Sequence, residues 1–260
     1  MRTSNPTLSE DIFVSLAKEN PISSKSNTMT IEGTVNKTAF FLLLTTATAL
    51  FAWFSIQMTG YPNEVGGIIN PGLTTTYMLI GGIGSFITAL FISFKKNLAM
   101  IGGMVYCLLE GLFIGGISAF AEAYYPGIAF QAGLLTFGTL FGLLGVYKSG
   151  LVKVTENFRL GVFAATGGIC MVYLLSFGMS LFGYHMPYIH ESGLMGIGFS
   201  LFVIVIAALN LVLDFDFIES GSKAGAPKYM EWYAAFGLIV TLVWLYVEIL
   251  RLLMKLQSRD

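Results

Sequence analysis

Seven long runs of apolar residues constrain the fold of this chain more than any other feature. A helix needs about 20 consecutive apolar residues to cross a hydrocarbon core about 30 Å thick. Charged residues make up only 11% of the 260 positions, against about a quarter in an ordinary soluble domain. The sequence therefore predicts an all-α membrane protein with spans at 38–58, 73–94, 99–123, 128–147, 160–182, 193–217 and 230–254.

A polar extension, residues 1–37, precedes the first apolar run. Apolar residues after Asn5-Pro6 share one face of a predicted short amphipathic helix, with a partly disordered tail as the alternative. These residues are Leu8, Ile12, Phe13 and Leu16. The extension lacks the order of regions found in a cleaved signal peptide. We therefore expect a cytoplasmic N-terminal extension, 1–37, followed by a seven-helix transmembrane domain, 38–256.

Lysine and arginine residues predict the orientation of the helices in the membrane. With the N-terminus inside, 11 of the 14 fall on the cytoplasmic side and none falls in the three outer loops. Cytoplasmic loops of membrane proteins carry such an excess of positive charge. Lys255 and Arg259, behind the seventh span, weakly oppose this orientation. We expect a multi-pass protein of the cell membrane with a cytoplasmic N-terminus.

Several classes of function find no support in the sequence. A net charge of -1 argues against a nucleic-acid partner. There is no phosphate-binding loop or cofactor motif, and Ser118 lacks the following glycine that a rhomboid-type serine protease uses. His185, His190 and Glu191 lack helical metal-site spacing and further ligands. We expect no enzymatic activity, no cofactor and no metal site.

Charged residues inside the predicted spans are candidate functional sites, because a charge at mid-membrane costs roughly 2.5 to 3.5 kcal/mol. Glu110 lies about twelve residues into the third span, and Arg251 lies deep in the last. One interpretation is a buried ion pair between Glu110 and Arg251. The other is a pair within the last helix, because Glu248 precedes Arg251 by three residues and shares its face.

A second group of polar residues lies near the cytoplasmic ends of the last two spans. Asn210 and Asp214 are four residues apart and share a helix face, and Glu231 begins the last helix at a similar depth. Two carboxylates in contact cannot both ionise readily, so an Asp214 and Glu231 pair would be a pH sensor. The alternative is that acids here, Asp216 and Glu219 above all, are simply hydrated by the cytoplasm.

The sequence resembles the transmembrane Bax-inhibitor-motif family in its bacterial YccA-like branch. The resemblance covers residues 30–256. It is carried by the third span, the end of the sixth, and the start and end of the seventh, at LEGLFIGG (109–116), LDFDFI (213–218), APKYMEWY (226–233) and LRLL (250–253). The segment TVNKT (34–38) before the first span also fits that branch.

The resemblance implies a seven-helix bundle with the last helix at its centre. It also implies a pH-sensitive calcium leak gated by paired aspartates near the cytoplasmic side. Asp214 matches the family's sixth-helix aspartate, Glu110 its early acidic residue and Arg251 the basic residue of its last helix. The second aspartate would fall near Thr241, where this chain has no acid. Glu231 is the substitute that we expect.

Three functions are compatible with these features. The first is a cation leak channel, with calcium ions as the expected cargo, in which Glu110, Asp214 and Glu231 line or gate the path. The second is an interaction protein that modulates a membrane-bound protease or another membrane protein, as similarity to YccA suggests. The third is a proton-coupled transporter of small solutes, although paired broken helices are not evident.

Overall fold

The computed structural model describes residues 28–184 and 193–258. Within this part of the chain seven helices are long and apolar enough to cross a membrane, as the sequence predicts. They are α2 (Ile31–Thr59), α3 (Pro71–Phe94), α4 (Ala99–Tyr124), α5 (Ile128–Lys148), α6 (Glu156–Leu181), α7 (Leu194–Lys223) and α8 (Met230–Gln257). A short 3-10 helix, η2 (Lys96–Leu98), precedes α4, and the strands β1 (Tyr61–Pro62) and β2 (Ile68–Ile69) form an antiparallel hairpin between α2 and α3.

The first helix begins earlier than expected, at Ile31 rather than at residue 38. Thr30 caps it, since its side chain accepts a hydrogen bond from the amide of Gly33, and such a cap satisfies an otherwise unpaired donor. The polar residues 31–37 therefore form the first turns of α2. The amphipathic helix expected after Asn5 lies outside the described residues.

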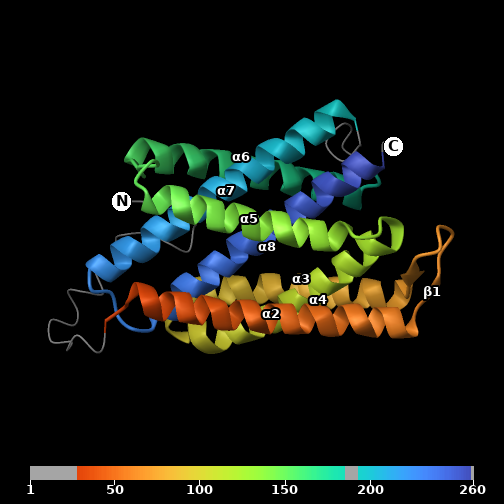
Figure 1. The fold of residues 1–260 in the computed structure, drawn as a ribbon, viewed down its shortest axis with the longest axis horizontal. Coiled ribbons are helices and arrows are strands. Elements are labelled where there is room, and N and C mark those ends of the chain that lie inside the picture. The colour runs from red at the N-terminus through yellow and green to blue at the C-terminus, as the bar shows by residue number, and fades with distance from the viewer. Residues whose placement is uncertain (1–27, 185–192, 259–260) are drawn as a thin grey trace.

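The helices form two groups with α8 between them. In Figure 1, α2, α3 and α4 lie on one side of α8, and α5, α6 and α7 lie on the other. α8 packs against α2, α4, α5 and α7. In the most apolar 18-residue stretch of α8, 61% is buried inside the protein, the largest share among the seven spans. The corresponding share in α6 is 11%. The expectation that α8 is the central helix in the membrane stays a prediction.

Glycines let α2 and α4 approach closely. A Cβ atom on Gly115 would lie 2.4 Å from the carbonyl oxygen of Ala49, so no larger residue fits without moving the two backbones apart. Small residues commonly permit such close packing between membrane helices. Gly167 and Gly168 of α6 are different, since an added Cβ would meet no atom within 4 Å there. The glycines of α4 and of α6 therefore do not share one role in packing.

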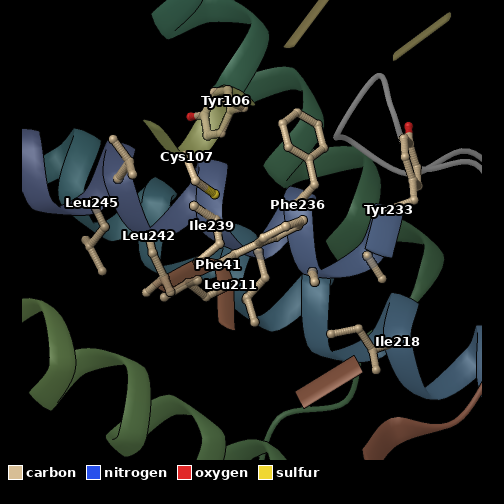
Figure 2. Close-up of a cluster of buried hydrophobic side chains, with 14 of the residues drawn as sticks. Phe41, Tyr106, Cys107, Leu211, Ile218, Tyr233, Phe236, Ile239, Leu242 and Leu245 are labelled. Atoms are coloured by element: carbon tan, nitrogen blue, oxygen red, sulfur yellow. The ribbon is translucent and has the colours of Figure 1, made fainter. Parts of the chain in front are cut away.

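The apolar core gathers around α8. Figure 2 shows side chains of α8 facing residues of α2, α4 and α7. Phe41 of α2, Cys107 of α4 and Leu211 of α7 are all fully buried in this cluster. The rings of Tyr106 and Phe236 meet edge to face, with 5.1 Å between their centroids. This packing fixes how far α4 and α7 are shifted along α8, and hence which polar side chains can meet.

Candidate functional site

Glu231 ties the beginning of α2 to the beginning of α8. Its carboxylate is fully buried. Oε1 accepts hydrogen bonds from the amide and the hydroxyl of Thr30, both at 2.9 Å, and lies 2.9 Å from Nζ of Lys228. Lys37 of α2 forms an ion pair with Oε2. We call the end of the bundle that holds this cluster the Glu231 end, and the opposite end of α8 the Arg251 end.

The chain just before α2 is part of the same arrangement. The amide of Met29 donates a 2.6 Å hydrogen bond to the carbonyl of Ala226, and Thr28 pairs with Pro227 in an isolated β-bridge. Met29 itself is buried. Residues 28–30, which we call the strap, therefore pack against the loop between α7 and α8.

The expected pair of Asp214 and Glu231 is not formed. Asp214 lies beside the hydroxyl of Thr241. Thr241 is ten residues beyond Glu231 on α8, a separation of about 15 Å at 1.5 Å per residue. Two lysines and the Thr30 amide already satisfy Glu231. The structure therefore does not bring Glu231 to Asp214, and Thr241, at the position where the second aspartate would fall, is the residue beside Asp214.

Asp214 occupies an unusual environment. It is buried on α7, and among the described residues its Oδ2 atom has no hydrogen-bond partner. No lysine or arginine in that part of the chain pairs with it. Buried polar atoms are nearly always hydrogen-bonded in folded proteins. Asp214 is therefore a strong candidate for a group that acts in more than one state of the bundle.

Asn210 lies one turn before Asp214 and is also buried. Its Nδ2 donates to the hydroxyl of Thr166 on α6 at 2.9 Å and to the carbonyl of Ile206 at 2.9 Å. The two polar residues of this face therefore have different neighbours: Asn210 connects α7 to α6, whereas Asp214 faces α8. Both side chains are buried within the protein.

Arg251 pairs with Glu248 rather than with Glu110. Its Nη1 lies 2.9 Å from Oε1 of Glu248 and donates a 2.8 Å hydrogen bond to the hydroxyl of Tyr173 on α6. Tyr173 in turn donates to Glu248 at 2.8 Å. Of the two pairings that the sequence left open, the structure thus forms the one within α8. Sequence reasoning missed Tyr173, because the rotation of α6 decides which of its residues faces α8.

Glu110 lies too far along the bundle to reach Arg251. Tyr106, one turn before Glu110, packs against Phe236 of α8, so Glu110 is level with about residue 240. Arg251 is then roughly 15 Å further along the helix. Glu110 is buried beside the hydroxyls of Ser85 and Tyr106, and no cation is paired with it among the described residues.

Asp216 and Glu219, near the Glu231 end, are paired rather than simply hydrated. Asp216 forms an ion pair with Arg159 of α6. Glu219 pairs with Lys223 on the exposed surface and accepts a hydrogen bond from Tyr147 of α5. The sequence interpretation of Asp216 and Glu219 as hydrated acids missed these partners. In residues 28–184 and 193–258, no group of three metal-ligating side chains gathers, and His185 and His190 lie outside these ranges.

A family model described as Bax inhibitor 1 like matches residues 5–258, nearly the whole chain. The chain belongs to the Bax inhibitor 1-like family. No curated protein and no solved structure matches it. Family membership confirms the resemblance carried by the third, sixth and seventh spans, and with the seven apolar helices it identifies a multi-pass membrane protein. Within the Bax inhibitor 1-like fold, Asp214 and Glu110 are thus buried carboxyl groups inside a membrane bundle.

Proposed function

We propose that this protein is a pH-sensitive cation leak channel of the cell membrane, with calcium as the expected ion and Asp214 at its gate. The observation that carries the proposal is the buried Oδ2 atom of Asp214, which has no hydrogen-bond partner among the described residues. An ionisable residue within a membrane bundle commonly marks an ion or proton pathway. Membership of the Bax inhibitor 1-like family supports the same function.

The protonation state of Asp214 is the proposed switch. When the carboxyl group is protonated, α7 packs against α8 with the Thr241 hydroxyl beside Asp214. Loss of the proton leaves a negative charge in the bundle, and a buried charge is costly unless a cation or water compensates it. Opening of the contact between α7 and α8 admits that water or cation. The leak therefore increases as pH rises.

No other charged group neutralises Asp214 in the described parts of the helices that pack against α7. On α6, Arg159 is held by Asp216, and on α8 the acid Glu231 is held by two lysines. On α2, Lys37 belongs to the Glu231 cluster, and on α5 Tyr147 donates to Glu219. These charged groups of the Glu231 end are therefore paired with one another rather than with Asp214. The carboxyl group of Asp214 alone would then control the proposed gate.

The orientation that we propose places the Glu231 end in the cytoplasm. Three lysines lie at this end: Lys37, Lys96 and Lys228. Nζ of Lys96 lies over the ring of Tyr233, 5.5 Å from its centroid. Positive residues favour the cytoplasmic side. Asp214 then lies nearer to the cytoplasmic mouth of the bundle than to the opposite one, so cytoplasmic pH would control the gate.

Purified protein in liposomes tests this function. We expect influx of calcium into vesicles loaded with a fluorescent indicator to increase between pH 6 and pH 8, with protein-free vesicles as the control. A wild-type protein that gives no flux at any pH in this range would contradict the channel, and would favour the alternative function of binding and modulating another membrane protein.

A further inference from the structure

A second polar region, unconnected with Asp214, lies at the Arg251 end. It is a pocket of about 440 Å³ between the ends of α4 and α8. Its wall includes Tyr124 and Tyr125 from the end of α4, and Arg251, Lys255 and Ser258 from α8. The eight described residues that line the pocket include these two cations and no carboxylate. Glu248 lies outside the lining and offsets the charge of Arg251. The pocket therefore favours an anionic group through the charge of Lys255 and the remaining N–H donors of Arg251.

The guanidinium group of Arg251 is only partly used by the protein. Nη1 makes every hydrogen bond that Arg251 forms with the described residues, to Glu248 and to Tyr173. Among the described residues Nε and Nη2 have no hydrogen-bond partner, and the Arg251 side chain is 33% exposed. The N–H bonds of Nε and Nη2 form a parallel fork, which matches two oxygen atoms of a phosphate group.

Glu248 and Tyr173 orient this fork. Glu248 is buried and holds Nη1 from one side, and the ring of Tyr173 lies 5.3 Å from the guanidinium carbon. Lys255 is fixed in a similar way, since its Nζ donates to the carbonyl of Gly196 and to the hydroxyl of Ser200 on α7. Both cations are thus held in place before any ligand binds, which reduces the entropy lost on binding.

The pocket lies at the depth of the lipid headgroups. Arg251 is six residues before the end of α8, about 9 Å along the helix axis. Tyrosine residues gather at the boundary between hydrocarbon and water, as Tyr124 and Tyr125 do at the end of α4. Long basic side chains reach from within a span to this boundary. The phosphate groups of the surrounding lipids lie at the same level.

We propose that this pocket binds the phosphate group of a membrane phospholipid, with the Nε and Nη2 edge of Arg251 as its bidentate donor. Lys255 supplies the second positive charge. Phe120 and Met254 give the pocket an apolar wall beside the glycerol and acyl chains. The site is independent of the proposed channel function, and a protein that conducts no ions would still bind the lipid.

Binding of phosphatidylglycerol by the full-length protein in detergent tests this site, with native mass spectrometry as the readout. Arg251→Lys keeps a positive charge beside Glu248 but removes the planar fork. We expect it to bind the lipid about tenfold more weakly than wild type. The matched control is Arg159→Lys at the Glu231 end, which should bind as wild type does. Lys255→Gln, which leaves Arg251 and its pair intact, should also weaken binding several-fold.

The two variants decide the outcome together. If Arg251→Lys loses thermal stability without lipid, Lys255→Gln provides the test on a folded protein. Unchanged lipid binding in Lys255→Gln, or in a stable Arg251→Lys variant, would overturn the proposal. An excess of inorganic phosphate should leave the lipid bound, since the apolar wall adds to its affinity. Complete displacement by inorganic phosphate would show that the pocket binds a free anion, and would overturn the lipid assignment.

Discussion

The pair of Glu248 and Arg251 shows how a charge is stabilised inside this membrane protein. The two residues are three positions apart on α8, with Tyr173 of α6 bridging them. An ion pair within one helix can form before the bundle assembles, so Arg251 is compensated even when α8 first enters the membrane. Glu110 has no such ion-pair partner in the described part of the chain, where the hydroxyls of Ser85 and Tyr106 lie beside it.

A double-mutant cycle tests this pairing. Glu248→Gln and Arg251→Met should each lower the free energy of unfolding by about 2 to 3 kcal/mol. This is less than the 3 to 5 kcal/mol typical of a broken buried pair, because the Arg251 side chain is 33% exposed. The double variant should recover part of the loss, as measured by thermal unfolding in detergent. Glu110→Gln with Arg251→Met should instead be additive within about 0.5 kcal/mol, and coupling between these two would contradict the assignment.

At this scale the sequence predicted which residues matter better than it predicted their partners. The candidate residues carry a charge inside a predicted span, where a charge is costly. They are Glu110, Asp214, Glu231, Glu248 and Arg251. Spacing along one helix revealed the Glu248 and Arg251 pair as an alternative. Partners on other helices depend on rotation and on the shift of one helix along another. Lys37, 194 positions from Glu231, could not be found in this way.

Among the helices, α2 is held in place by two contacts. The sequence predicts only some of the residues that form them. The first turn of α2 is fixed by Glu231, and its middle packs on the glycines of α4. The helix begins before the predicted start of the span at residue 38, because hydropathy marks where apolar residues begin, whereas the helix begins after its cap, Thr30. The remaining spans begin and end within about six residues of their predicted limits, because Lys, Pro and Gly residues interrupt the apolar runs clearly.

The close contact of α2 and α4 predicts a position-dependent effect of alanine. Gly115→Ala should lower the free energy of unfolding by about 1 to 3 kcal/mol, because its Cβ would lie 2.4 Å from a backbone oxygen of α2. Gly168→Ala is the matched control. It meets open space and should be neutral or slightly stabilising. Equal effects of the two substitutions on the melting temperature in detergent would argue against the packing of α2 on α4.

The Glu231 cluster predicts that the strap depends on one carboxylate. Glu231→Gln leaves Lys37 and Lys228 without their acid, and we expect a loss of about 3 kcal/mol in thermal unfolding experiments. Limited proteolysis should then cut the chain near residues 28–30 more rapidly. Glu64→Gln serves as the control, since Glu64 is exposed in the hairpin at the other end, and should change neither measurement. A fully stable Glu231→Gln variant would show that the strap is held by other contacts.

For the whole molecule, the distribution of basic residues predicts which end faces the cytoplasm. Single cysteines at Glu64 and Lys223, on a background without Cys107 and Cys170, report the two ends of the bundle. An impermeant thiol reagent added to intact cells should label Glu64→Cys and leave Lys223→Cys unlabelled. The reverse pattern would place the Glu231 end outside, and would require the cytoplasmic control of the gate to be abandoned.

The central claim is that one carboxyl group, Asp214, makes the leak respond to pH. The most direct measurement is calcium flux into liposomes at pH values from 6 to 8 for Asp214→Asn, with Asp216→Asn and Glu231→Gln beside it. We predict that Asp214→Asn holds flux at one level across this range, because asparagine cannot lose a proton there. Asp216→Asn and Glu231→Gln should retain the wild-type increase with pH. A wild-type pH profile in Asp214→Asn, or a flat profile in Glu231→Gln, would contradict the account.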